Sequence, residues 1–435
     1  MRVTPQSPAG YPAARLDISA DVAVIGGGII GHGIAWEARQ SGRSVVIIDD
    51  APGTGASWAA AGMLAPVSEL HYQEEELLEL MLHSSELWPA FAAGLQRGAP
   101  AGAGPDTGYL TTSTLAVGAD AADRRALADL RGAQRSSGLT VEPLTVREAR
   151  AREPLLSPGI SCAFDIPADH QVDPRRLLAL IADSLLGCAV RERAAGLLWE
   201  DGRVTGVGLA GGGAVHAGET IIANGLDAAS LGGLPAGLQL PLRPVYGDIL
   251  RLRVPAYLQP LLTSTVRGMV HGVPVYIVPR QDGTVVIGAT QREDALSGAG
   301  KDQAGPPGPE GLPGSAVSAG GVYQLLRDAQ VLVPAVAELE LLEATARARP
   351  GTPDNAPLLG RVADAGTGGD VPGLIIATGF FRHGVLLTPA AASICRQLLD
   401  GTADPRWAPF RPHRFSGPPA TPAKLPAPAP IKETA

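Results

Sequence analysis

The stretch DVAVIGGGIIGHGIAWEARQSGRSVVIIDD, residues 21–50, decides the fold of this chain. It has the pattern of a buried strand, a run of glycines, a helix to about residue 41 and a second apolar strand. Gly26, Gly28 and Gly31 have the spacing GxGxxG. Glycines in this order permit a tight turn and let backbone N–H groups approach a pyrophosphate at the positive end of the helix.

An acidic residue completes this pattern. Asp49 comes 18 residues after Gly31, at the end of the second strand, where a carboxylate can bind ribose hydroxyls. Glycine turns are common in a chain with 55 glycines, so the spacing alone would be weak support. Strand, glycines, helix, strand and acid in this order predict a dinucleotide-binding unit.

Length and composition restrict the class of protein. The 435 residues exceed what one small core needs, so we expect two closely joined domains. No apolar run approaches the ~20 residues of a membrane helix, and the net charge of −8 argues against a nucleic-acid partner. Cys162, Cys188 and Cys395 are few, odd in number and far apart. This usage fits reduced thiols in the cytoplasm and predicts neither a disulfide frame nor a metal site.

Three segments are expected to lie outside the folded parts. Residues 1–19 are polar, contain three prolines and lack the apolar centre of a signal peptide, which predicts a disordered leader. Residues 298–320 are rich in Gly, Pro, Ala and Ser and predict a flexible insertion. Residues 413–435 are proline rich and predict a disordered tail.

The rest of the chain divides into two interleaved parts. Alternating strands and helices predict a discontinuous α/β nucleotide-binding domain over residues 20–65, 150–240 and 350–412. Longer strands predict a mainly antiparallel sheet inserted beside it, and we assign this second domain residues 66–149 and 241–349.

Local signals place individual elements. Thr145 and Glu148 have the spacing of a capping box and predict a short helix. Asp173 followed by Pro174 predicts the start of a helix that extends to residue 186. Asp282-Gly283, between two β-type runs, predicts a hairpin over residues 273–290.

Five stretches resemble the glycine oxidase and D-amino acid oxidase family of FAD enzymes, and within it the bacterial glycine oxidases of thiamine-thiazole biosynthesis. They are VAVIGGGIIG, SWAAAGML, YIVPRQDGTVVIGAT, RPGTPDNAPLLG and ATGFFRHGVLLTPA. They occur in family order and spread over residues 20–412. The resemblance implies the D-amino acid oxidase or glutathione-reductase-like fold: a Rossmann-type FAD-binding domain with an inserted, mainly antiparallel substrate domain.

The resemblance implies catalytic roles for three residues. Arg349 stands at the position of the family's carboxylate-binding arginine, and a planar guanidinium can make two charge-assisted hydrogen bonds to a carboxylate. Tyr276 would donate its hydroxyl to the same carboxylate. From the residues alone, a solvated arginine and a core tyrosine are the alternatives. Arg382 matches the family's second active-site arginine, near flavin and substrate.

The cofactor contacts are expected from several segments. We expect residues 379–384 at a helix start to direct backbone N–H groups at the flavin, where they would stabilise the charge of its reduced form. The resemblance places Gly62 and Met63 against the ring and Val172 on the adenine side, and Ser57 is a candidate phosphate donor. The full set of expected cofactor residues is Gly26, Gly28, Gly31, Asp49, Ser57, Gly62, Met63, Val172, Gly379, Phe381, Arg382, His383, Gly384 and Val385.

Some positions depart from the family pattern or carry no assigned role. The family reads WAGLRP where this chain has TARARP, residues 345–350, and Gln291 stands where a family member can carry an apolar residue. Both changes leave the size of the substrate open. No cysteine lies in the segment that carries covalent flavin in the related sarcosine oxidases, so we expect noncovalent FAD. No general base is assigned, because the amine can enter deprotonated, and we interpret His271 and His383 as structural.

Together these observations predict a cytoplasmic, homo-oligomeric FAD-dependent oxidase of glycine or another small amine acid, such as sarcosine or a small D-amino acid. Its partners would be the amino acid and O2, which would be reduced to H2O2, with no nucleic-acid or membrane partner. The resemblance implies that the imine hydrolyses to glyoxylate and ammonia or enters thiazole formation. Two alternatives stay open: a D-amino acid or sarcosine dehydrogenase with another electron acceptor, and an FAD-binding protein without turnover.

Overall fold

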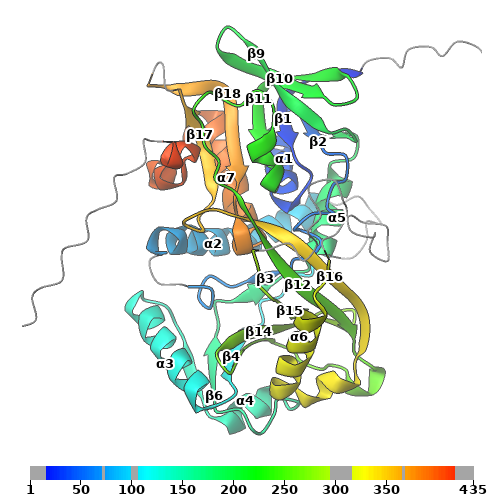
Figure 1. Cartoon of the computed structure of the whole chain (residues 1–435), viewed down its shortest axis with the longest axis vertical. Helices are drawn as coiled ribbons and strands as arrows, with labels where there is room; N and C mark the ends of the chain where they lie inside the picture. Colours follow the sequence, from blue (N-terminus) through cyan, green and yellow to red (C-terminus); the bar gives the residue numbers. More distant parts are fainter. Residues whose placement is uncertain (1–15, 71–73, 99–105, 294–315, 365–367, 417–435) are drawn as a thin grey trace, which may run out of the picture.

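The computed structural model describes residues 16–70, 74–98, 106–293, 316–364 and 368–416. Two eight-stranded sheets lie one above the other in Figure 1, each with helices of its own. Within the described residues, no helix is long and apolar enough to cross a membrane. The chain therefore folds as the mixed α/β protein that the sequence predicts.

The first sheet is built around β1 (Leu16–Ile25), whose last four residues are buried. This strand pairs in parallel with β2 (Val45–Ile48) on one side and with β11 (Gly213–Ile222) on the other. The remaining strands of this sheet are β8 (Ala189–Val190), β9 (Ala194–Glu200), β10 (Arg203–Leu209), β17 (Leu358–Ala363) and β18 (Asp370–Thr378). The parallel strands end at a common edge, where α1 begins.

Helices cover the first sheet and complete its core. The helix α1 (Ile29–Gln40) contacts α7 (Thr388–Asp400), although more than 300 residues separate them in the chain. The helices α2 (Glu75–Gly98) and α5 (Pro174–Ser184) pack against the same core. The indole N–H of Trp88 in α2 donates to the carbonyl oxygen of Leu386 at 2.8 Å. These contacts bring the last part of the chain back to the first strand.

The second sheet is antiparallel except for one parallel pair, β13 with β4. Its strands follow one another in the order β16, β12, β15, β14, β13, β4, β6 and β5. They are β4 (Thr114–Gly118), β5 (Glu142–Leu144), β6 (Cys162–Ile166), β12 (Arg243–Arg253), β13 (Thr265–Val270), β14 (Val273–Pro279), β15 (Thr284–Gly288) and β16 (Glu340–Gly351). The flanking helices are α3 (Ala121–Ser136), α4 (Val146–Arg152) and α6 (Ala319–Leu332). A separate small pair, β3 (Met63–Leu64) with β7 (His170–Gln171), links the two regions.

Several local predictions are confirmed. The hydroxyl of Thr145 accepts from the N–H of Glu148 at 3.2 Å, and the Glu148 carboxylate accepts from the N–H of Thr145 at 2.8 Å. The side chain of Asp173 caps α5, which ends at residue 184 and not at 186. The β14–β15 hairpin pairs as expected.

Some boundaries differ from those expected. The strand β1 begins at Leu16, so residues 16–19 belong to the sheet and not to a leader, because they pair with β11. The strand β6 pairs with β4 and β5 in the second sheet, although its residues fall in the range assigned to the nucleotide-binding part. The helix α6 begins inside the expected insertion, and a 3-10 turn, Pro412–Phe415, begins one residue before the expected tail. Of these three segments, residues 1–15, 298–315 and 417–435 lie outside the described residues.

Candidate active site

A cavity of about 900 Å³ is lined by residues of both sheets. Its size is in the range of small-molecule and cofactor sites. The predicted site residues that line it are Gly26, Gly28, Asp49, Ser57, Gly62, Met63, Tyr276, Arg349, Gly379, Phe381, Arg382, His383, Gly384 and Val385. Gly31 and Val172 do not line it.

Glycines shape the end of the cavity that belongs to the first sheet. Gly26 has φ +111°, and a Cβ there would lie 2.5 Å from the carbonyl oxygen of Ala223. A Cβ on Gly31 would overlap the carbonyl oxygen of Gly26, so this residue permits close packing of helix and strand behind the cavity wall. With side chains excluded, the turn between β1 and α1 presents backbone to the cavity.

Asp49 and Ser57 stand at this glycine turn. The carboxylate of Asp49 accepts from the N–H groups of Gly27 and Ala51, so its charge lies beside the turn at the end of β2. The hydroxyl of Ser57 accepts from the N–H of Ile29 at 2.9 Å, in the first turn of α1. Because this bond uses the oxygen as an acceptor, the hydroxyl proton stays available to a negatively charged ligand.

Val172 departs from the expected cofactor contact. Its N–H donates to the carbonyl oxygen of Gly62 at 2.8 Å, and its own carbonyl accepts from the guanidinium of Arg280 at 2.8 Å. Both backbone groups are thus engaged within the protein. Val172 holds the loop around Gly62 in place from behind, while Gly62 and Met63 themselves face the cavity.

The segment over residues 379–385 also differs from expectation. It does not begin a long helix: Phe381–His383 forms a single 3-10 turn, and α7 begins at Thr388, where Pro389 can enter the first helical turn. Seven residues of the segment nevertheless line the cavity together. The residues that face the site therefore belong to a short turn, and not to the first turn of a long helix.

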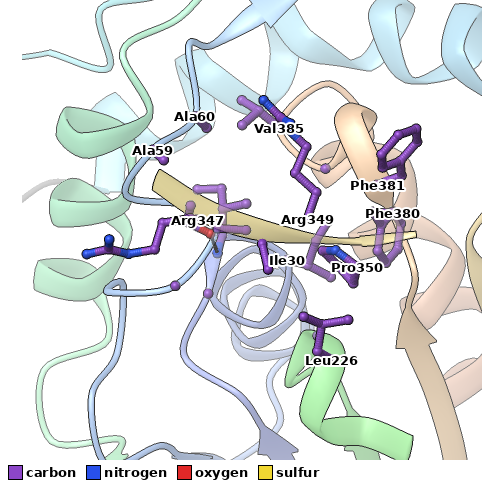
Figure 2. A pocket seen from close by; sticks show the side chains of 18 of the residues that line it. Ile30, Ala59, Ala60, Leu226, Arg347, Arg349, Pro350, Phe380, Phe381 and Val385 are labelled. Atoms are coloured by element: carbon purple, nitrogen blue, oxygen red, sulfur yellow. Dashed lines mark hydrogen bonds between the residues drawn. The ribbon is translucent and has the colours of Figure 1, made fainter. Parts of the chain in front are cut away.

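Tyr276 and Arg349 project into the cavity from the second sheet, on β14 and β16. The position that each takes is left open by a glycine on a neighbouring strand: a Cβ on Gly288 would overlap the hydroxyl of Tyr276, and one on Gly247 would overlap the guanidinium of Arg349. In Figure 2, the Arg349 side chain extends toward Val385, across the cavity from its own strand. Burial raises the pKa of Tyr276 to about 12, so its hydroxyl remains a donor at neutral pH.

Arg382 lies in a network of opposite charges. Its guanidinium pairs with Glu69 at 3.0 Å and with Glu74 at 2.9 Å, and Glu69 also pairs with Arg267. Burial disfavours the charged form of Glu69, but the charges of Arg267, His383 and Arg382 outweigh it and lower the pKa of this carboxyl to about 2. The guanidinium of Arg349, in contrast, has no hydrogen bond or ion pair within the part of the chain that the structure describes.

The TARARP stretch lies on β16, and its added arginine, Arg347, makes hydrogen bonds within the protein. Arg347 donates to the carbonyl oxygen of Thr54 at 2.9 Å and to the hydroxyl of Thr345 at 3.2 Å. It leaves the strand in a different direction from Arg349 (Figure 2). Arg347 therefore ties the second sheet to the loop after β2, and Gln291 is a further polar residue of the lining.

Sequence reasoning missed several residues of the site. Arg267 faces Tyr276 across β13 and β14, and the two-residue turn at His271-Gly272 contains the signal for this register, because it pairs residues equally distant from the turn. Glu69 lies in a loop and gives no such signal. Asn224, after β11, lines the cavity with a buried amide oxygen that has no partner among the described residues.

These features fit a dinucleotide cofactor with a flat ring. Exposed backbone at the glycine turn, the carboxylate of Asp49 and the hydroxyl of Ser57 are a donor and acceptor set suited to pyrophosphate and ribose. Gly62, Met63 and the 379–385 segment form a further part of the cavity wall. These residues would hold the cofactor with its reactive end toward the second sheet.

Comparisons with known proteins agree with this geometry. The chain matches the family model described as FAD dependent oxidoreductase (DAO) over residues 21–398. The glycine oxidase of Geobacillus kaustophilus is 32% identical over 387 residues, which cover 87% of this chain and 93% of that protein. The crystal structure of a glycine oxidase from Geobacillus kaustophilus has a TM-score of 0.76 at 30% identity, covering 91% of this chain and 99% of that one.

A second kind of relative is longer. The bifunctional protein ThiO/ThiG of Trichormus variabilis is 29% identical over 403 residues, which cover 92% of this chain and 55% of that protein. The chain thus spans about half the length of such relatives. The family match covers most of the chain and includes both sheets, and the chain therefore belongs to the DAO family of FAD-dependent oxidoreductases.

Proposed function

We propose that this protein oxidises glycine or another small amine acid, such as sarcosine or a small D-amino acid, with O2 as the electron acceptor. The observation that carries the proposal is Arg349, a guanidinium without a protein partner among the described residues, beside the phenol of Tyr276 in a cavity that also contains the glycine turn. Such a pair is suited to one carboxylate. The glycine oxidases among the relatives support the class of substrate.

In this proposal the protein positions the reacting carbon. Arg349 makes two charge-assisted hydrogen bonds to the substrate carboxylate, and Tyr276 donates a third. The α-carbon is then held against the wall formed by Gly62, Met63 and the 379–385 segment. Noncovalently bound FAD would accept a hydride from that carbon and pass the electrons to O2, giving H2O2. No cysteine belongs to the described lining, which supports noncovalent binding.

The proposal extends to the setting of the enzyme. The relatives named ThiO/ThiG support a role in the thiazole branch of thiamine biosynthesis. The free cysteines Cys162, Cys188 and Cys395 support a reducing, cytoplasmic location. A homo-oligomeric state is part of the same proposal, and the mass of the purified protein in solution tests it.

An anaerobic titration tests the proposed reaction. The purified holoenzyme is mixed with glycine, sarcosine or D-alanine, the flavin absorbance is followed, and air is then admitted with an assay for peroxide. Bleaching by one of these amines and return of the colour with peroxide is the expected result. Bleaching without peroxide would identify a dehydrogenase, and no bleaching by any small amino acid would favour a flavoprotein without turnover.

A further inference from the structure

We call the part of the cavity near Tyr276 and Arg349 its substrate end. Among the described residues, some of the arginines at this end have carboxylate partners and one does not. Arg267 and Arg382 share Glu69, and Arg382 also reaches Glu74, which lies behind the wall of the cavity. Two carboxylates thus compensate two guanidiniums. Arg349 is left without a carboxylate within the described part of the chain.

The charges of Arg267, Glu69 and Arg349 all influence the hydroxyl of Tyr276. Arg267 and Tyr276 are directly paired across β13 and β14, so their side chains lie on one face of the sheet. Burial has the largest effect on the pKa of Tyr276, and the charges of Arg349, Glu69 and Arg267 act on it as well. The phenol that would contact the substrate carboxylate therefore lies within range of all three charges.

We propose that Glu69 is a specificity-determining residue: by neutralising Arg267 and Arg382, it leaves the substrate end with charge for one carboxylate and rejects amino acids that carry a second anionic group. The inference rests on the proposed function, because it takes Arg349 as the group that binds the substrate carboxylate. A second anion near Arg267 or Arg382 would have to displace the carboxylate of Glu69 from both guanidiniums. Like charges in a partly dehydrated site repel, and this repulsion is a means of excluding a ligand.

The inference gives Arg267 a role that the proposed reaction does not require. Buried carboxylates are rarely left without a partner, because dehydration of an unpaired charge is costly. Arg267 holds Glu69 ionised inside the protein, and Arg382 holds it from the other side. The Glu69 carboxylate is therefore held ionised and in place in the wall, where it offsets positive charge.

Ligands matched in size test this inference without any turnover. Malonate has two carboxylates, and malonamate has an amide in place of one of them. Each is titrated into the holoenzyme at about pH 8, where carboxylic acids are ionised, and binding is read from the change in flavin absorbance. We expect the wild-type enzyme to bind malonamate more tightly than malonate by about tenfold or more. Equal affinities in the wild-type enzyme would overturn the inference.

Substitution of Glu69 tests the cause. In Glu69→Gln the amide can still accept from Arg267, but its charge is gone, and the preference for malonamate should shrink by about tenfold or more. Glu338→Gln is the matched control, since it removes an exposed carboxylate that does not belong to the cavity lining and should leave the preference unchanged. An unchanged preference in Glu69→Gln holoenzyme would overturn the inference.

The double variant Glu69→Gln/Arg267→Gln separates charge from shape. It removes one negative and one positive group, so the preference for malonamate should return toward that of the wild-type enzyme. A double variant that still behaves like Glu69→Gln would show an effect of shape and would overturn the inference. Failure of both ligands to bind would overturn the carboxylate site and the inference together. Discrimination that depends on Glu69, with no amino acid able to bleach the flavin, would leave the inference standing and remove only the proposed reaction.

Discussion

The two ends of the cavity are built in different ways. At the end formed by the first sheet, the decisive residues lack side chains: Gly26 and Gly31 let backbone groups of one short segment form the surface. At the end formed by the second sheet, side chains from distant parts of the chain meet: Glu69 comes from a loop, Arg267 from β13 and Arg349 from β16. The first end depends on local conformation, and the second depends on long-range packing and charge balance.

The largest expected effect is at the backbone end. Gly31→Ala would force a Cβ into the carbonyl oxygen of Gly26, where neither backbone segment can yield without moving β1 from α1. We expect the free energy of unfolding to fall by about 3 kcal/mol or more, together with loss of bound FAD. The flavin-to-protein absorbance ratio and a denaturant titration measure the two effects.

A glycine without neighbours is the control for this variant. A Cβ on Gly132, inside α3, would meet no atom within 4 Å, so Gly132→Ala should keep FAD and stabilise the helix slightly. Wild-type flavin content in Gly31→Ala would contradict the view that the first end is defined by the exclusion of side chains.

The next effect is at the other end. Arg349→Ala should leave the flavin bound and weaken substrate binding by about 3 kcal/mol, roughly 100-fold, because the carboxylate loses the guanidinium that we propose binds it. Arg349→Lys should recover part of this loss, since it keeps the charge without the planar fork. The substrate dependence of anaerobic flavin reduction measures both. Unchanged kinetics for Arg349→Ala would remove this residue from the site.

The same difference explains what the sequence could predict. The β1–α1–β2 unit lies within 30 consecutive residues, and its glycines, apolar strands and Asp49 are all local signals, so its form follows from the sequence directly. The capping box at Thr145 and the β14–β15 hairpin are local in the same sense. At these three places the predictions were confirmed to within a few residues.

The charge network was not predictable in this way. Glu69 and Arg267 are 198 residues apart, and nothing in the loop around Glu69 indicates which strand it will face. The sheet to which β6 belongs was missed for the same reason, because strand pairing is set by the tertiary fold. Arg349 was singled out through a family resemblance, and the sequence did not indicate that Arg382 would already have two carboxylate partners.

One glycine of the second sheet combines the two features, because its missing side chain leaves room for a charged group. Gly247→Ala would place a Cβ in the guanidinium of Arg349, so the arginine must move while its charge is kept. We expect kcat/KM to fall by about tenfold to 100-fold, with FAD retained. Gly208→Ala, a strand glycine of the first sheet with only ordinary contacts around its Cβ position, is the control. Wild-type kinetics for Gly247→Ala would mean that Arg349 works from another position.

The smallest expected effect concerns Tyr276 and is measured through its dependence on pH. Burial raises the pKa of Tyr276 to about 12, so this phenol should still donate to the substrate carboxylate at pH 10, where an ordinary tyrosine is half ionised. Its folded-state pKa lies above the unfolded value, so the stability that it contributes is lost as the pH rises from about 10 through about 12. Tyr276→Phe should remove this pH dependence, keep FAD and weaken substrate binding by roughly tenfold. The difference between the tyrosinate titrations of the wild-type and Tyr276→Phe holoenzymes measures the pKa. A transition near pH 10 would indicate that water reaches this hydroxyl. The substrate end would then not be dehydrated, as the proposed rejection of a second anionic group requires.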